Sequence, residues 1–186
     1  MVLAGLGNPT DKHTFSRHNA GFLFLDWLSG KDEWSDMKNL FLKHKKLSLL
    51  SHKDRMLIDL IKPQTFMNDS GKAVAAFCNF YKINPKVDLI LIFDDLDLEI
   101  GNWKVQVEKG PKIHNGVNSV EELLGTKKFK RIRIGVFNAV TRVNENGEKL
   151  SGADYILQDF TKEELNLLHT KIFPQIKESL ALIAIE

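Results

Sequence analysis

The sequence predicts an α/β fold: one three-layer domain over residues 1–186, in which helices flank a twisted mixed, mostly parallel β-sheet. The chain has 186 residues, 43% of them hydrophobic, which is enough to bury one sizeable core. Residues 89–93, LILIF, form an apolar run without alternation, which is typical of a strand covered on both faces. Strand-like and helix-like segments alternate along the chain, as they do where helices connect parallel strands.

The N-terminal half begins with strand, loop and helix. Residues 2–4 form a short buried strand, and the Gly and Pro residues of GLGNPT then end it. A helix follows over residues 20–29. Residues 47–61 predict two strands around a polar turn at 52–55. An amphipathic helix then starts at Asp69 and directs four side chains inward: Val74, Phe77, Cys78 and Tyr81.

The C-terminal half continues the alternation. Strands at 89–93, 103–107 and 131–136 accompany a helix near 117–124, and residues 138–152 predict a mobile polar loop.

The last helix begins at a capping box formed by Thr161 and Glu164. Its apolar residues recur at spacings of three and four: Leu165, Leu168, Ile172, Ile176 and Leu180. Pro174 predicts a kink. We expect this helix to pack on the body of the domain as a lid or flank.

Composition limits the classes of function. Lys and Arg number 26 and Asp and Glu 24, and this net charge of +2 fits a small-molecule substrate or a polyanion. Cys78 is the single cysteine and is expected to be a core thiol in a reducing compartment. The stretch before Gly5 is too short for a signal peptide, and no run of about 18 apolar residues predicts a membrane span. The sequence therefore predicts a cytoplasmic protein without membrane contact.

Polar side chains follow, or lie near, the ends of several predicted core elements. The clusters are Asn8; Arg17, His18 and Asn19; Asn68; Asp94 and Asp95; and His114 with Asn115. Loops at the carboxyl ends of parallel strands converge on one crevice in an open α/β sheet. These clusters are therefore candidates for one shared site.

The chemistry of this set centres on His18. An imidazole titrates near neutrality and can take a proton from water when a carboxylate holds its other nitrogen, and Asp94 is the candidate carboxylate. Side-chain amides in the loops offer donors to a carbonyl oxygen that becomes negative in a tetrahedral intermediate. The set suits hydrolysis of an acyl bond, although a histidine before an apolar helix is more often a packing or capping residue.

The sequence gives weaker evidence for three other kinds of site: a metal site, a dinucleotide-binding site and a serine nucleophile. Asp94 and Asp95 fit a turn cap or a metal site, but no further cluster at ligand spacing accompanies them, so we assign no metal. Gly5 and Gly7 follow a strand as in a dinucleotide-binding loop, but Thr10 stands where the third glycine belongs. The chain has no GxSxG serine, so water is the expected nucleophile.

Charge is distributed unevenly along the chain. Residues 38–62 and 109–133 each carry seven Lys or Arg against two acidic residues, a net charge of +5, whereas residues 84–101 carry one Lys against five acidic residues, a net charge of −4. Most such runs are solvated surfaces of the protein. The alternative is a surface that binds the phosphate backbone of a nucleic acid.

Six segments taken together resemble the bacterial-type peptidyl-tRNA hydrolases in order and spacing: GLGNPT, SRHNAGF, KPQTFMNDSGKAV, FDDLDLEIG, HNG and RIRIG. The match runs from residue 2 to about residue 136. The resemblance implies a monomer that cleaves the ester between a nascent peptide and the 3′ end of tRNA, recycles the tRNA and needs no cofactor.

The resemblance also implies roles for particular residues. His18 would be the base that activates water, and Asp94 its orienting carboxylate. Substrate contacts are implied at four positions: Asn8, Phe66, Asn68 and Asn115. Arg133 would bind the tRNA 5′ phosphate. The polar cluster at 17–19 would then be a catalytic rim at the mouth of the core.

Two departures from the family pattern concern substrate binding. Pro111, Lys112 and Ile113 replace small residues and should stiffen and fill a loop beside the cleft. Gln106 stands where the family has a phosphate-binding lysine, and Lys104, two residues away on the same strand face, is predicted to substitute in tRNA binding.

Two rival functions remain at this stage. One is an RNA-binding relative that kept the fold and lost turnover, and the other is a nucleotide-dependent oxidoreductase that rests only on GLG. A pure binding module has no need of a poised base, so the intact set favours the enzyme: His18, Asp94, Asn68 and Asn115.

Overall fold

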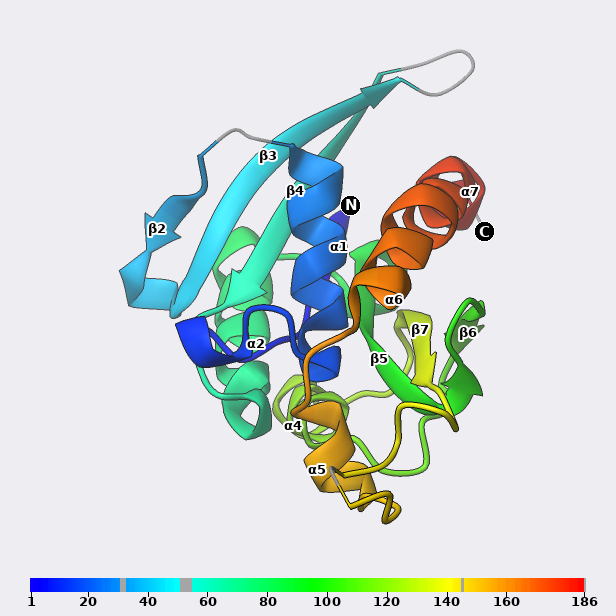
Figure 1. The fold of residues 1–186 in the computed structure, drawn as a ribbon. Helices are drawn as coiled ribbons and strands as arrows, with labels where there is room; N and C mark the ends of the chain where they lie inside the picture. The colour runs from blue at the N-terminus through cyan, green and yellow to red at the C-terminus, as the bar shows by residue number, and fades with distance from the viewer. Residues whose placement is uncertain (31–32, 51–54, 145, 186) are drawn as a thin grey trace.

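The computed structural model describes residues 1–30, 33–50, 55–144 and 146–185, and these residues build one seven-stranded sheet with helices on both faces (Figure 1). The strand order is β2-β3-β4-β1-β5-β7-β6. The strands are β1 (Val2–Gly5), β2 (Ser35–Met37), β3 (Leu42–Leu50), β4 (Arg55–Pro63), β5 (Leu89–Glu99), β6 (Trp103–Val107) and β7 (Lys130–Phe137). The four central strands β4, β1, β5 and β7 run parallel, and β2, β3 and β6 are antiparallel to their neighbours.

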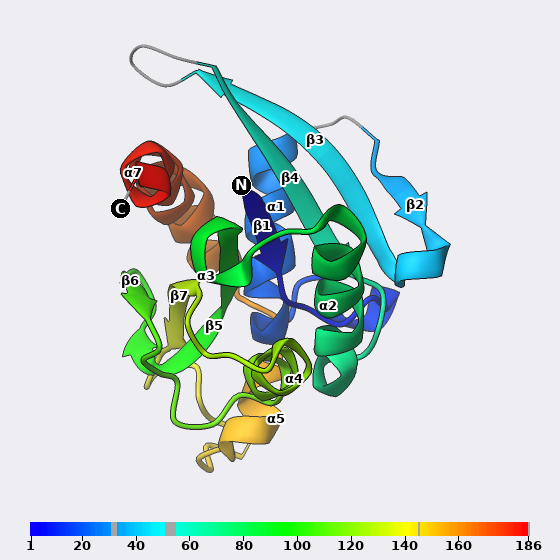
Figure 2. The same ribbon diagram turned by 180° about the vertical axis from the view of Figure 1, so that it is seen from behind.

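Helices cover both faces and make three layers. The α-helices are α1 (Ala20–Ser29), α2 (Ser70–Tyr81), α3 (Pro85–Asp88), α4 (Asn115–Leu124), α5 (Gly152–Ile156), α6 (Lys162–Leu167) and α7 (Phe173–Ile185). One core cluster joins α1 and the C-terminal helices to the sheet, and the other joins α2 and α4 to its opposite face. Figure 2 shows the face that carries α2 and α4. The predicted α/β fold is confirmed.

Most predicted elements are present with small shifts of their ends. The helix at 20–29 and the strand at 103–107 agree with α1 and β6 residue by residue, and the hairpin at 47–61 is longer than predicted. Of its predicted turn at 52–55, residues 52–54 lie outside the described residues. The edge strand β2 and the helix α5 were not predicted. Tyr81 was wrongly placed inward: it is 42% exposed at the end of α2, and its ring contacts that of Phe77 at a tilted angle.

The strand that contains LILIF extends much further than the predicted end at Phe93. β5 continues to Glu99, so Asp94 and Asp95 lie inside a strand and are 2% and 1% exposed. Pairing with β7 continues through both residues. Charged residues are tolerated at buried strand positions only when partners satisfy them, and both aspartates have such partners here.

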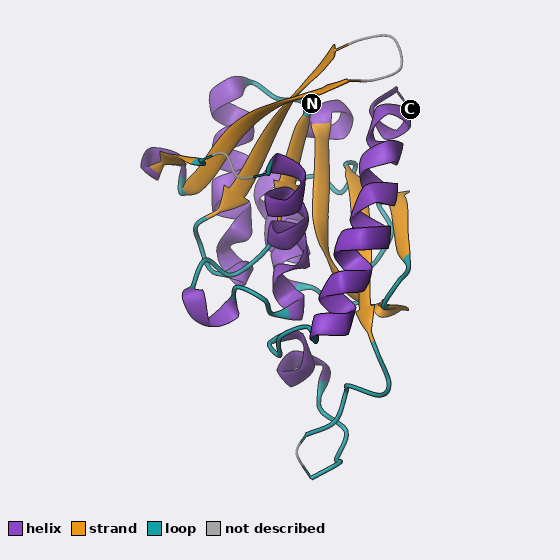
Figure 3. Ribbon diagram, turned by 45° about the horizontal axis from the view of Figure 1, so that its top comes forward, coloured by secondary structure: helices purple, strands orange, loops and turns teal. Residues whose placement is uncertain are grey.

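The C-terminal helical region begins as predicted, with the capping box of Thr161 and Glu164. It is then divided by a π-helical turn, Leu168–Ile172, before α7. Pro174 explains this irregularity, because its nitrogen cannot donate to the carbonyl of Thr170 in a regular α-helix. The loop after β7 extends from the body of the fold (Figure 3) and includes a bridge between Val143 and Lys149. Among the described helices, none has the length and apolar character of a membrane span.

Candidate active site

The turn that carries His18 lies against the sheet because Gly21 has no side chain. A Cβ atom on Gly21 would lie 2.3 Å from the carbonyl oxygen of Ile92 and 2.5 Å from the amide nitrogen of Leu6. Glycine is therefore required where α1 begins over β1 and β5. This close approach brings the short 3₁₀ turn η2 (Arg17–Asn19) beside the segment of β5 that contains Asp94.

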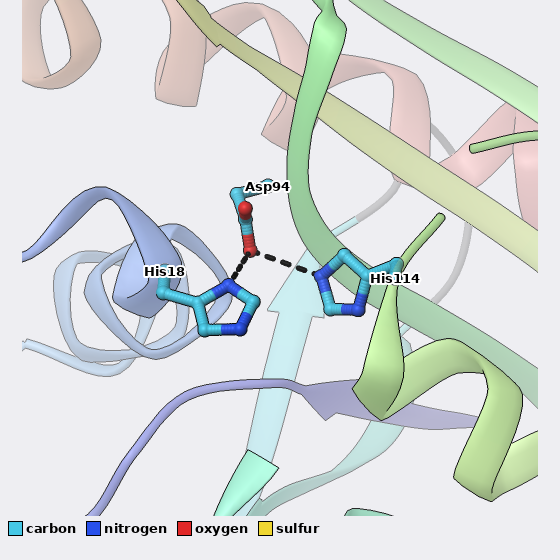
Figure 4. Close-up of side chains that lie close together, drawn as sticks. All are labelled: His18, Asp94 and His114. Carbon is cyan, nitrogen blue, oxygen red and sulfur yellow. Dashed lines mark hydrogen bonds and ion pairs between the residues drawn. The ribbon is translucent and has the colours of Figure 1, made fainter. Parts of the chain in front are cut away.

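Asp94 connects two imidazoles, as Figure 4 shows. Its Oδ1 atom lies 2.8 Å from Nδ1 of His18 and 3.0 Å from Nε2 of His114. The three residues are 2%, 6% and 5% exposed for Asp94, His18 and His114, respectively. They come from β5, from η2 and from the residue that caps the N-terminus of α4. Segments far apart in the sequence thus meet at one carboxylate.

The hydrogen bonds determine which nitrogen atoms carry protons. Nδ1 of His114 accepts a bond of 3.3 Å from the amide of Val117, so its proton resides on Nε2, which donates to Asp94. A carboxylate accepts only, so His18 donates to it through Nδ1–H. This tautomer leaves the lone pair of His18 on Nε2, which is the arrangement required of a general base.

The electrostatic environment keeps Asp94 ionised and makes His18 more basic. Burial lowers the pKa of His18, but the charge of Asp94 and its hydrogen bond outweigh burial, so the net pKa lies above the ordinary value of 6.5. Burial opposes ionisation of Asp94, and the facing imidazoles and their hydrogen bonds hold its pKa well below the ordinary 3.8. Asp94 is therefore a carboxylate throughout the neutral range.

His18, Asp94 and His114 also have the composition of a metal site, since their ligand atoms lie within 4.8 Å of one another. The donor set does not fit that use. Nδ1 of His114 is occupied as an acceptor, so the proton on Nε2 blocks the nitrogen that would have to coordinate the metal. The hydrogen-bond pattern instead fits a carboxylate that accepts one N–H group from each imidazole.

An apolar cavity of about 400 Å³ adjoins this cluster. His18, Asp94, His114 and Asn115 form its polar part. Its other walls come from the end of β5, from the loop before α4 and from α5: Leu96, Pro111, Ile113, Gly152, Ala153 and Ile156. The loop that was expected to fill the cleft thus contributes Pro111 and Ile113 as apolar walls. Such a cavity suits a partly apolar substrate group held next to a base.

Asn8 organises the loop after β1. Its Oδ1 accepts a bond of 2.9 Å from the amide of Met67, and Asn19 binds both its backbone amide (2.7 Å) and its carbonyl (3.1 Å). Asn8 lines a second, smaller cavity of about 190 Å³ and not the cavity at His18. Through its bonds to Asn19 and Met67, Asn8 links the segment that contains His18 to the turn η4 (Met67–Asp69).

The other predicted substrate contacts lie at the surface near these elements. Phe66 is 63% exposed and precedes η4, and Asn68 is an exposed residue within it. Asn115 is exposed and lines the cavity beside His18. Their predicted contacts with substrate remain predictions.

The predicted tRNA residues lie on β6 and β7. Lys104 is exposed and pairs in register with Arg133. Arg133 is 8% exposed, and its guanidinium donates to Asp95 and to Gln106. Gln106 thus serves as a partner of Arg133, while Lys104 remains open to solvent.

The polar cluster at 17–19 is not a single rim, which corrects the expectation. Arg17 is 1% exposed and turns inward to Glu164, His18 faces the cavity, and Asn19 binds Asn8. The charge of Arg17 is paired with Glu164, which lies far away in the sequence, and the local sequence pattern did not identify this partner.

Sequence reasoning also missed the bond from His114 to Asp94. The available signal was the position of His114 directly before a helix, where a residue whose side chain caps the helix is expected.

Comparisons with known proteins identify one family. The sequence model described as peptidyl-tRNA hydrolase matches residues 2–186. A peptidyl-tRNA hydrolase of Thermotoga petrophila is 36% identical over 186 residues, covering 100% of this chain and 91% of that protein. A peptidyl-tRNA hydrolase of Agathobacter rectalis is 39% identical over 88% of this chain and 82% of its own length.

A solved structure agrees with these relatives. The crystal structure of peptidyl-tRNA hydrolase from Acinetobacter baumannii superposes with a TM-score of 0.81 at 25% identity, covering 99% of this chain and 88% of that one.

Proposed function

This chain belongs to the peptidyl-tRNA hydrolase family, and from its site geometry we propose that it uses His18 as the general base for an attacking water. It is a hydrolase of the ester bond between peptide and tRNA. The observation that carries the mechanism is the 2.8 Å bond from Nδ1 of His18 to Asp94, which leaves the lone pair on Nε2. The proposal includes a monomer that acts in the cytoplasm and recycles the tRNA of aborted translation.

The first step is attack by water on the ester carbonyl. Nε2 of His18 removes a proton from water, and the resulting imidazolium is stabilised by the negative charge of Asp94. His114 holds the same carboxylate oxygen from its other side, so the carboxylate keeps its orientation while His18 gains charge. The oxygen of water then bonds to the carbonyl carbon, and the carbonyl oxygen becomes negative.

The second step is collapse of the tetrahedral intermediate. His18 returns its proton to the 3′ oxygen of the tRNA as the ester bond breaks, and the peptide leaves as a carboxylic acid. We assign stabilisation of the oxyanion and alignment of the peptide to the side-chain amides of Asn68 and Asn115. Neutral side-chain N–H groups can donate hydrogen bonds of this kind. Asn8 and Phe66 complete the substrate contacts, and Asn8 also fixes η4 through Met67.

The reaction should lose rate in acid. Since the base must be neutral and its pKa is raised above 6.5, protonation should remove half of the activity at a pH above 6.5 and nearly all of it well below that value. The measurement is kcat/KM for release of tRNA from an N-blocked aminoacyl-tRNA as a function of pH. A rate that stays constant from pH 5 to 8 would contradict the assignment of His18 as the base.

The tRNA acceptor stem is assigned to the surface of β6 and β7. We assign the phosphate contact to Lys104, which is exposed there. Arg133 lies opposite in register, and its guanidinium is buried against Asp95 and Gln106. Loss of one phosphate contact weakens binding at every salt concentration and reduces the slope of log K against log salt by about 1.

Lys104→Ala should show this decrease in a salt titration of tRNA affinity. Lys38→Ala provides the control, because Lys38 is an exposed residue of the 3₁₀ turn η3 (Lys38–Leu40) that follows β2, at the opposite edge of the sheet from β6. An affinity and slope equal to those of the wild type in Lys104→Ala would exclude Lys104 from the interface.

A further inference from the structure

Arg17, the neighbour of His18, forms the centre of a buried polar network that reaches the C-terminal region. Its Nη2 lies 2.7 Å from Oε2 of Glu164, and its Nη1 donates to the carbonyls of Asp159 (2.6 Å) and Gln158 (3.2 Å). The guanidinium lies over the ring of Tyr155, 4.2 Å from its centre. Arg17 and Glu164 are 1% and 5% exposed, so the pair is removed from solvent.

Glu164 is held by more than Arg17. Its Oε1 accepts from Asn138 Nδ2 (2.9 Å) and from the hydroxyl of Thr141 (3.1 Å), and its Oε2 accepts from the backbone amide of Thr161 (2.9 Å). Thr141 also accepts from Arg17 at 3.1 Å. A buried carboxylate with this many donors has one well-defined orientation, and so has the guanidinium that it binds.

The same network joins two parts of the active site. Main-chain bonds connect η2 to the segment after α5: Arg17 N donates to Gln158 O at 3.0 Å, and Phe160 N donates to Phe15 O at 2.9 Å. α5 comes directly before this segment, and its Gly152, Ala153 and Ile156 wall the cavity beside His18. Arg17 therefore belongs to the turn that carries the base, and it binds the segment that follows the cavity wall α5.

We propose that Arg17 and Glu164 are positioning residues, and that their buried ion pair sets the orientation of His18 against Asp94 and the placement of α5 over the cavity. This inference rests on the proposed role of His18. The ion pair makes no contact with the cavity, so it acts through the residue next to it in sequence and through the main chain of 158–160. A change at Glu164 should then alter turnover in molecules that are fully folded.

The experiment compares Glu164→Gln, Arg17→Lys and the control Arg142→Lys. Arg142 lies in the same loop region, donates to the carbonyl of Leu150 and approaches Tyr155, but it does not bind η2. The melting temperature of each variant is measured first. The kcat and KM on N-blocked aminoacyl-tRNA and the pH dependence of kcat/KM are then measured below that temperature. Asp94 on β5 and His114 before α4 are the titratable groups that face His18, and neither is altered in these variants.

We expect Glu164→Gln to lower kcat by about 10- to 100-fold, the scale of a misplaced catalytic group, and to move the acid limb of kcat/KM to lower pH as His18 loses its contact with Asp94. Arg17→Lys, which keeps the charge, should retain part of the rate, and Arg142→Lys should match the wild type. If Glu164→Gln does not fold, Thr141→Val, which removes the hydroxyl bonds to Arg17, Glu164 and Tyr155, should show the same shift of the acid limb.

A lowered melting temperature with unchanged kcat and unchanged acid limb in these variants would overturn the proposal and leave a purely structural ion pair. Two different results would refute the proposed function itself. Either the wild type would show no turnover, or turnover would persist when His18 is replaced.

Discussion

Replacement of His18 by alanine should reduce kcat by a factor of about 100 or more, the scale of losing a general base. In the proposed mechanism Nε2 of His18 accepts the proton of water, and Asp94 cannot replace it, because that carboxylate is buried and remains hydrogen-bonded by His114. The measurement is release of deacylated tRNA from an N-blocked aminoacyl-tRNA, with wild type and variant matched for folding by circular dichroism.

His169→Ala is the matched control, because His169 is exposed on the π-helical turn, where its ring lies against Phe173. It should retain the wild-type rate. Turnover by His18→Ala within a few-fold of the wild type would remove His18 from the mechanism. Absence of turnover in the wild type with tRNA still bound would favour the RNA-binding alternative, with the loss of activity traced to the departures at Pro111 and Gln106.

Replacement of Asp94 by asparagine should have an effect at least as large, about 10³- to 10⁴-fold in kcat, which is the scale known for a histidine forced into the wrong tautomer. Two N–H donors now converge on one carboxylate oxygen. An asparagine offers one weaker acceptor and an NH₂ group, and where NH₂ faces His18 the imidazole must accept through Nδ1. Its proton then moves to Nε2, and the base is lost.

The test combines kinetics with nitrogen chemical shifts of the histidine side chains, which report the tautomer directly. Asp36→Asn on the exposed edge strand β2 removes the same charge away from the site and should leave rate and tautomers unchanged. Asp94→Asn with the Nδ1–H tautomer of His18 preserved and kcat near the wild-type value would show that the carboxylate does not orient the base.

Local patterns were enough to predict most elements of the fold, although not β2, α3 or α5. The helix at 20–29 and the strand at 103–107 were located because periodicity and Gly or Pro breaks act over a few residues. His18 and Asp94 were identified as candidates from residue type and from their place near core elements. The capping box at Thr161 was also visible, because both of its partners lie within one turn.

Other features depended on contacts between distant segments. Asp94 was expected just after the end of the strand at 89–93 and lies within β5, because two histidines at separations of 76 and 20 residues bind its carboxylate. Arg17 was expected at the rim and is buried, because Glu164 is 147 residues away in sequence and adjacent in space. Whether a charged side chain is buried depends on whether a partner neutralises its charge. A local sequence pattern cannot identify a partner that is far away in the sequence.

The sequence thus determined the candidate residues for the chemistry and most of the segments that form strands and helices, since propensity, periodicity and residue type are local properties. The packing of η2, β5 and the C-terminal region decided the tautomer of His18, the role of His114 and the inward turn of Arg17. These outcomes follow from hydrogen bonds between groups that meet only when the sheet and its two helical layers are assembled.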